Sequence, residues 1–150
     1  MLAAPAYGDL VTVHVDGAYT GGRFLLLEWL QPPGEWTPLH RHVRADQTMY
    51  VLEGELTVHL PGRTAVAGPG ACIHGPMGVA HTERVTSEHP ARLVEVNAPA
   101  GFERFVAAVG QPATELTLPD PPLDLGDPDG LTVVAAEHGI ELLGPPGALP

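Results

Sequence analysis

Four polar residues in two separate segments have the types and spacing of a metal site. His40 and His42 lie one residue apart, Gln47 follows five residues later, and His81 stands in a distant segment, GACIHGPMGVAHTERV. Side chains two apart in a strand point the same way, about 6.5–7 Å apart along the chain, so His40 and His42 can offer two imidazoles to one ion. Gln47 is an odd number of residues from both histidines, so in one continuous strand its side chain would point to the opposite face. A turn over 43–46 must therefore bring it back on a neighbouring strand. We therefore expect a site for a divalent transition metal, with a structural remnant of such a site as the alternative.

Short strands separated by turns are the elements that must position these residues. Alternating or continuous apolar runs predict the strands, and Gly, Pro and Asn punctuate the intervals between them. The predicted strands cover residues 10–15, 23–30, 48–52, 55–60 and 91–96. Many short strands at this spacing indicate an all-β sandwich or barrel.

The pattern changes after Asn97. Residues 101–110, GFERFVAAVG, place apolar side chains on one helical face, with Gly110 as the C-terminal cap. Residues 111–126 are rich in Pro and Asp and predict a connector. A second helix is expected from Asp127 to a stop at Gly139, because Asp is a good N-cap and Pro128 suits the first helical position. We predict one domain, with a barrel over about 8–98 and a C-terminal helical extension over 99–150.

Composition excludes several classes of function. The formal charge is −11, from 18 acidic residues against seven arginines and no lysine, so a basic face for nucleic acid or anionic membranes is not expected. The missing lysine excludes a Schiff base and a P-loop. The single cysteine, Cys72, and the lack of a signal-peptide pattern at the N-terminus favour the reducing cytoplasm. Eight histidines remain as the main chemical resource.

The two histidine segments resemble the paired motifs of the cupin superfamily. The first family motif is G-x5-H-x-H-x3or4-E-x6-G, and this chain matches it at Gly34, His40, His42, Gln47 and Gly54. The second is G-x5-P-x-G-x2-H-x3-N, matched at Gly70, Pro76, Gly78 and His81, with Val85 in place of the final Asn. The resemblance implies a small single-domain cupin similar to quercetin 2,3-dioxygenase-like proteins. The implied fold is all-β, a cupin double-stranded β-helix (jelly-roll barrel) with two short peripheral C-terminal helices.

The resemblance also implies the chemistry of the site. In metal-dependent cupins the ion usually sits on three histidines and a glutamate, which correspond here to His40, His42, His81 and Gln47. The metal would be Fe, Mn, Ni or Zn. Gln47 can ligate through its amide oxygen or hydrogen-bond a neighbouring group. It supplies no negative charge, so metal affinity should fall while Lewis acidity rises. Nor can it act as the general base that the glutamate is thought to be in flavonol-cleaving relatives.

Other residues could contribute to the site. Asp46 competes with Gln47 for the ligand position, because the family spacing tolerates one residue fewer. His74 is a candidate acid/base group near the barrel mouth, with a surface histidine as the alternative. Trp36, Met49 and Val51 are candidates for a substrate pocket, although such side chains more often belong to the core.

These observations favour an enzyme that acts on a small-molecule substrate. The first expectation is a metal-dependent dioxygenase-like activity on a flavonol-, enol- or polyketide-like substrate. The alternatives are a non-redox cyclase or isomerase that uses the metal as a Lewis acid, and a cupin that binds a small molecule without turnover. By analogy with small cupins we expect a homodimer.

Overall fold

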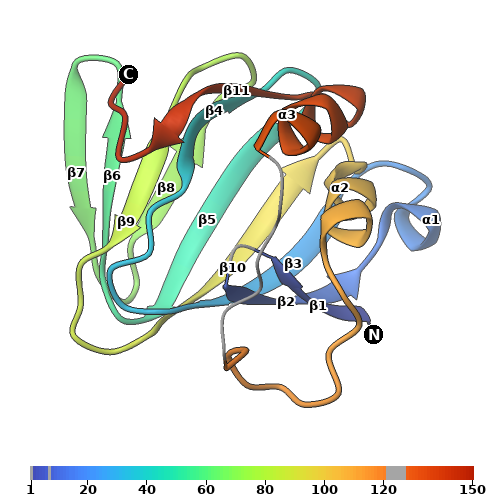
Figure 1. Cartoon of the computed structure of the whole chain (residues 1–150), viewed down its shortest axis with the longest axis horizontal. Coiled ribbons are helices and arrows are strands. Elements are labelled where there is room, and N and C mark those ends of the chain that lie inside the picture. The colour runs from blue at the N-terminus through green and yellow to red at the C-terminus, as the bar shows by residue number, and fades with distance from the viewer. Residues whose placement is uncertain (1, 7, 121–127) are drawn as a thin grey trace.

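The computed structural model describes residues 2–6, 8–120 and 128–150 (Figure 1). Six strands form the larger sheet, in the order β1-β2-β3-β10-β5-β8. Their bounds are β1 Leu2–Ala6, β2 Asp9–Val15, β3 Leu25–Gln31, β10 Ala91–Ala98, β5 Asp46–Glu53 and β8 Cys72–Gly75. All the pairs in this sheet are antiparallel.

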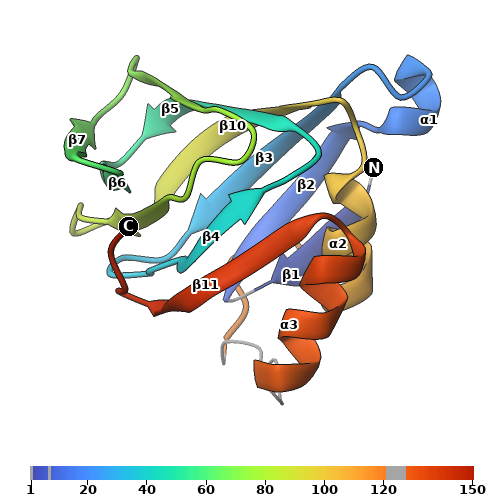
Figure 2. The same cartoon turned by 90° about the horizontal axis from the view of Figure 1, so that it is seen from above.

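Two smaller sheets form the opposite wall. Strand β4 (Pro38–His42) pairs with β11 (Ile140–Pro146), and β6 (Leu56–Leu60) lies between β7 (Arg63–Ala67) and β9 (Thr82–Val85). Two isolated antiparallel bridges, Trp36 with Arg84 and His40 with His81, link the β4 segment to the β9 segment. Seen from above, the two walls curve around a shared interior (Figure 2). The all-β barrel predicted from the sequence is thus confirmed.

Alternation of side chains builds the core between these walls. In β3, the residues Leu25, Leu27, Trp29 and Gln31 are buried, whereas the residues between them are only half-buried. Strand β10 alternates in the same way, with Ala91, Leu93, Glu95 and Asn97 buried. Because successive side chains of a strand point to opposite faces, each strand gives every second residue to the interior. Most of these residues are apolar, but Gln31, Glu95 and Asn97 bring polar groups into the core.

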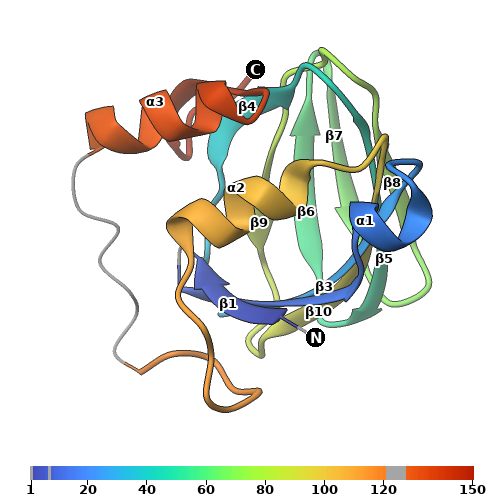
Figure 3. The same cartoon turned by 90° about the vertical axis from the view of Figure 1, so that its right-hand side faces the viewer.

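Three helices accompany the barrel: α1 (Gly17–Thr20), α2 (Phe102–Val109) and α3 (Pro128–Glu137). Figure 3 shows α2 and α3 on one side of the barrel. The two C-terminal helices predicted from the sequence are confirmed, although the expected N-cap, Asp127, lies outside the described residues. Gly110 does follow α2, with an extended backbone (φ −87°) in place of a left-handed cap. No helix in the described ranges is long and apolar enough to cross a membrane.

The last part of the chain differs from the predicted helical extension. After the left-handed Gly139, residues Ile140–Pro146 form strand β11 on β4, with Ile140 opposite His42 and Leu142 opposite His40. Leu131, Val134 and Leu142 pack against the buried cluster of Phe105, Ala135 and Ile140, as expected of apolar residues there, while Leu143 is 47% exposed. The sequence IELLGPP is short and apolar, and periodicity alone does not separate such a run from a helix end.

Candidate metal centre

The three predicted histidines meet on the inner side of the barrel. His40 and His42 project from β4, and His81 lies just before β9, held beside β4 by the bridge to His40. One ring nitrogen from each lies within 4.8 Å of the others. The ring centroids of His40 and His81 are 4.4 Å apart, and those of His40 and His42 are 5.3 Å apart. Within the described part of the chain this is the one group of His, Cys, Asp and Glu side chains that satisfies such a distance limit.

Backbone carbonyls contact the Nδ1 atoms of two of these rings. His40 Nδ1 lies 2.7 Å from the carbonyl oxygen of Pro38, and His81 Nδ1 lies 3.0 Å from that of Val79. A carbonyl oxygen can only accept a hydrogen bond, so the Pro38 contact puts the proton of His40 on Nδ1 and leaves its Nε2 lone pair free. The Val79 contact favours the same tautomer of His81, whereas the Oε1 of Gln47, beside Nε2, favours the other. This outer contact is the one that usually orients a metal-binding histidine.

Gln47 lies in the same group, on β5 across the interior. Its side chain is 4% exposed, and its Oε1 lies 2.7 Å from His81 Nε2. When the proton of His81 is on Nδ1, both of these atoms are acceptors, and a cation that binds them would relieve the repulsion between their lone pairs. The three imidazoles and the amide oxygen therefore fit a divalent transition metal, which takes nitrogen and oxygen ligands.

Burial keeps the imidazoles neutral. It lowers the pKa of His40 well below its usual value of 6.5, and the neighbouring His81 and His42 lower it further. Burial, followed by the effect of His81, lowers the pKa of His42 to about 3, and burial also lowers the pKa of His81. Neutral imidazole is the form that binds a metal, so the site is ready for an ion at neutral pH.

Glu95 supports Gln47 from behind. This residue of β10 is 2% exposed and hydrogen-bonds the side chains of Asn97 and Gln47. Burial is the main cause that raises its pKa to about 7, while the hydrogen bonds from Asn97 and Gln47 oppose the shift. Glu95 thereby holds the amide of Gln47 with its oxygen toward His81.

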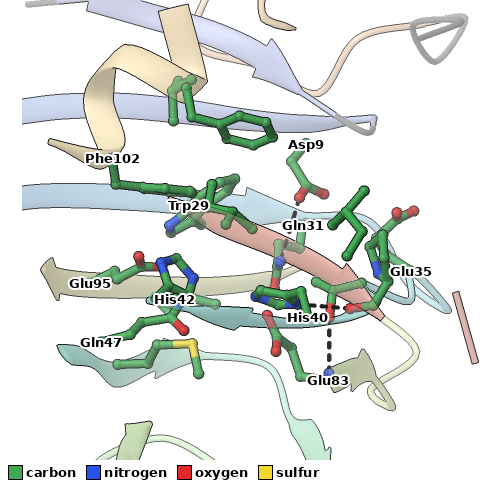
Figure 4. Close-up of a pocket in the computed structure, with 18 residues that line it drawn as sticks. Asp9, Trp29, Gln31, Glu35, His40, His42, Gln47, Glu83, Glu95 and Phe102 are labelled. Atoms are coloured by element: carbon green, nitrogen blue, oxygen red, sulfur yellow. Dashed lines mark hydrogen bonds between the residues drawn. The ribbon is translucent and has the colours of Figure 1, made fainter. Parts of the chain in front are cut away.

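A pocket opens onto this group of ligands. His40, His42 and Gln47 line it, whereas His81 is 2% exposed and lies behind them. Aromatic residues form one wall: the ring of Phe102 lies 5.2 Å from that of His42 and 6.1 Å from that of Trp29. Figure 4 shows Trp29, His42, Gln47 and Glu95 toward one end of the pocket, and Asp9, Gln31, Glu35 and Glu83 toward the other.

Of the three predicted pocket residues, only Met49 lines this pocket. Val51 is fully buried in the main apolar core, because the interior face of β5 runs past the end of the pocket. Trp36 stacks on His59 with ring centroids 5.6 Å apart and carries Arg84 over its ring. Trp36 and Val51 therefore lie outside this pocket, because alternation shows which face a residue occupies, but not how far along the barrel the cavity extends.

Two other candidates lie away from the centre. His74 is exposed on β8, with its Nδ1 2.9 Å from Thr48 Oγ1, because Ile73 and Gly75 take the inward positions of that strand. His74 thus lies on the outer face of β8, apart from the three histidines, and its role as an acid/base group stays a prediction. Asp46 is exposed and accepts a hydrogen bond from the backbone N–H of Met77 at 2.8 Å, so it does not replace Gln47.

Sequence reasoning missed the buried carboxyl groups of the pocket. Asp9 is 2% exposed, Glu83 is 5% exposed, and Glu35 is half-buried. Burial raises the pKa of Asp9 well above 3.8, with Glu35 adding to the shift, and burial raises the pKa of Glu83 to about 7. The sequence did contain a sign of them. Asp9 in β2 and Glu83 in β9, like Glu95 in β10, are charged residues at positions that strand alternation assigns to the interior.

Known proteins resemble this chain in fold and in part of its sequence. A family profile described as "Cupin domain" matches residues 27–97. Quercetin 2,3-dioxygenase of Bacillus subtilis (strain 168) is 32% identical over 93 residues, which make up 62% of this chain and 27% of that protein. The chain thus spans about a quarter of the length of this curated relative.

Solved structures show the same barrel. The polyketide cyclase RemF of Streptomyces resistomycificus superposes with a TM-score of 0.57 and 26% identity, over 81% of this chain and 84% of RemF. KdgF of Halomonas sp. has a TM-score of 0.58 at 18% identity, over 65% of this chain and 84% of KdgF, and shows the fold alone. Together with the two histidine motifs and the barrel that joins them, these matches show that the chain has the cupin fold and is similar in sequence to cupin-domain proteins over residues 27–97.

Proposed function

We propose that this protein is a metal-dependent enzyme that moves protons on a small enolisable carbonyl compound, as a cyclase or isomerase does. One observation carries the proposal: His40, His42 and the amide of Gln47, with His81 behind them, line a pocket that also holds the buried carboxyl group of Glu83, whose Oε2 has no hydrogen-bond partner. The similarity to the polyketide cyclase RemF over most of both chains supports the same class of chemistry.

His40, His42, His81 and Gln47 would hold the ion. On four neutral ligands a divalent metal would keep its full charge, and the chemistry it would supply is that of a Lewis acid toward a carbonyl oxygen. Glu95 orients the Gln47 amide, and the aromatic wall of Trp29 and Phe102 excludes water and fits a flat substrate.

Glu83 is the group placed to accept the proton from the carbon next to the carbonyl. Its carboxyl group is 5% exposed, and its Oε2 is free to bind a substrate proton. The proton then returns to another atom in an isomerisation, or it leaves with water when a ring closes. Gln47 lacks an ionisable group, so another residue must carry out this transfer, and general acid–base catalysis by a carboxyl group is typically worth about 10²–10⁴-fold in rate.

An oxygenase is the second candidate, supported by the 32% identity to quercetin 2,3-dioxygenase. This order reverses the one expected from the sequence. The matched segment is 27% of that enzyme, and the carboxylate of the family motif is Gln47 here. The buried carboxyls of the pocket, by contrast, suit proton transfer without oxygen.

One assay separates the candidates. The protein is purified without added metal, its Fe, Mn, Ni and Zn content is measured, and 2′-hydroxyacetophenone is added in D₂O. A cyclase or isomerase should speed exchange of the methyl protons, followed by NMR, without oxygen uptake. Uptake of oxygen would support the dioxygenase, and exchange no faster than with the His81→Ala variant would contradict the proposal.

We also propose that the chain forms a homodimer, as its resemblance to small cupins implies, and that it works in the cytoplasm, where its single cysteine, Cys72, would stay reduced. Sedimentation equilibrium tests the dimer: a single species of monomer mass across micromolar concentrations would contradict it.

A further inference from the structure

The pocket has an end, opposite His42, where hydrogen-bond acceptors lack partners. Asp9 and Gln31 belong to neighbouring strands, β2 and β3, and Gln31 Nε2 donates to Asp9 Oδ2 at 3.4 Å. Their other oxygens, Asp9 Oδ1 and Gln31 Oε1, are buried with no hydrogen-bond partner. The two side chains are 2% and 4% exposed and line the pocket together with Glu35. We call Asp9, Gln31 and Glu35 the acceptor end; Figure 4 shows them grouped away from His42.

An unpaired buried acceptor is costly, typically about 1–3 kcal/mol, and native proteins rarely leave several together. Two such atoms in a pocket wall indicate a ligand that supplies the missing donors. The acceptor end also gathers carboxyl groups, because Asp9 and Glu35 line the same pocket as Glu83. Ionised phosphate and carboxylate groups carry no donor for the unpaired oxygens of Asp9 and Gln31, so the ligand does not present such a group at this end.

A second metal ion does not fit this end. Among the described residues, the three histidines are the only group of three or more that brings its ligand atoms within 4.8 Å of one another, so the carboxyl groups of Asp9, Glu35 and Glu83 do not converge on one ion. An ammonium group does not fit well either, because a divalent ion on four neutral ligands in the same pocket would repel it. A neutral hydroxyl group supplies a donor without adding charge.

We propose that the acceptor end binds hydroxyl groups of the substrate, so that the substrate is a polyhydroxylated aromatic or polyketide-like compound. The inference rests on the proposed function, because the same pocket must hold the substrate's carbonyl group near the histidines. The hydroxyl groups donate to Asp9 Oδ1 and Gln31 Oε1, and the ring lies along Trp29 and Phe102. Asp9 and Gln31 are then residues that determine which substrate binds and in which orientation.

Binding of two small probes tests the inference on the metal-loaded protein. Resorcinol offers two hydroxyl donors on one ring, and 1,3-dimethoxybenzene has the same ring without donors. Titration followed by ligand-observed NMR should show resorcinol binding at least fivefold more tightly. Resorcinol that fails to bind, or binds no better than its dimethyl ether, would overturn the inference. Benzylamine binding more tightly than resorcinol would also overturn it, in favour of a cationic ligand.

Variants of Asp9 and Gln31 test whether these two residues bind the hydroxyl groups of resorcinol. Asp9→Asn and Gln31→Met keep the side-chain size and each remove one of the acceptors. Each variant should weaken resorcinol binding at least fivefold and leave 1,3-dimethoxybenzene binding within twofold. Glu88→Gln, on the exposed turn before β10, is the control and should change neither. Unchanged resorcinol binding in a folded Asp9→Asn and a folded Gln31→Met protein would refute the inference.

Metal content separates this inference from the proposed function. The two variants should keep the metal content of the wild type, because Asp9 and Gln31 hydrogen-bond each other, whereas His40 and His81 hydrogen-bond Pro38, Val79 and Gln47. If the wild type holds no metal yet prefers resorcinol through Asp9 and Gln31, the acceptor end stands and the metal-dependent function fails. If the wild type binds the metal but shows no preference for resorcinol, the inference about the acceptor end is contradicted and the proposed function is not.

Discussion

His40 and His81 exchange two backbone hydrogen bonds, from His40 N to His81 O at 3.0 Å and from His81 N to His40 O at 2.8 Å. This bridge ties the two histidine motifs together at the backbone, so that the imidazoles converge before any ion binds. A preformed site of this kind loses little conformational entropy on binding, which favours affinity. The preformed geometry also means that the metal and the fold can be perturbed separately.

Removal of one imidazole should abolish metal retention without changing the fold. His42→Ala leaves two histidines and one amide, too few ligands for tight binding of a transition metal by neutral groups. We expect a loss of at least tenfold in bound metal, measured by elemental analysis, with an unchanged far-UV circular dichroism spectrum. His74→Ala removes an exposed histidine and should retain full metal content. Full retention in His42→Ala would show that the ligand set is wrong.

A carboxylate at position 47 should bind the metal more tightly but disturb the apo-protein. Gln47→Glu adds one negative charge to the ligand set, and we expect metal affinity to rise about tenfold or more. The same change loses the amide donor to Glu95 and sets two carboxyl groups together in a buried site. The apo-protein should therefore unfold at a lower urea concentration than the wild type.

The double variant Gln47→Glu/Glu95→Gln tests that explanation. It restores an amide beside the new carboxylate, so it should keep the gain in metal affinity and recover the urea midpoint. Metal titrations and urea unfolding curves on all three proteins give both quantities. No change in metal affinity in Gln47→Glu would mean that residue 47 does not contact the ion.

Burial of Asp9 makes the free energy of unfolding of the apo-protein depend on pH. Its pKa is raised well above 3.8, first by burial and next by Glu35. The folded state therefore binds this proton more tightly than the unfolded state, and the contribution of Asp9 to stability falls as pH rises from about 3.8 through the raised pKa. Asp9→Asn keeps an oxygen for Gln31 and removes this titration.

The measurement is the free energy of unfolding in urea between pH 4 and pH 8, with metal removed. The Asp9→Asn protein should gain stability relative to the wild type as pH rises, and the gain should be largest at the alkaline end. Parallel curves for the two proteins would contradict the raised pKa. Glu88→Gln, exposed in the folded state, should follow the wild type throughout.

Strand β11 should be part of the stable barrel. Ile140 is 3% exposed, faces Phe105 and Ala135, and pairs with His42. Ile140→Ala should lower the free energy of unfolding by about 2–4 kcal/mol, the usual cost of truncating a buried aliphatic side chain. Leu143→Ala, at a position that is 47% exposed, should cost less than about 1 kcal/mol. Equal effects of the two substitutions in urea unfolding would show that β11 is merely appended.

The sequence by itself determined the strands of the barrel and the candidate metal ligands. Alternation in DLVTVHV, LLLEWLQ and ARLVEVNA predicts strands, because a strand exposes every second residue to the interior whatever its partners are. The spacing of His40, His42 and Gln47 predicted that their side chains share one site, and the resemblance to the cupin motifs added His81. Strand alternation and the spacing of the first three residues are local rules, and each can be read from a few neighbouring residues.

Only the tertiary structure decided how the pocket is lined. Asp9, Gln31, Glu83 and Glu95 come from four strands, and their meeting depends on pairing and register that no local pattern specifies. The same is true of β11, whose apolar run is compatible with a helix until it pairs with β4. Trp36, Val51 and His74 lie outside the pocket for the related reason that alternation gives the face of a residue but not its depth along the barrel or the extent of the cavity. The pairing of His40 with His42 follows from short-range spacing, whereas the shape and polarity of the pocket follow from long-range packing.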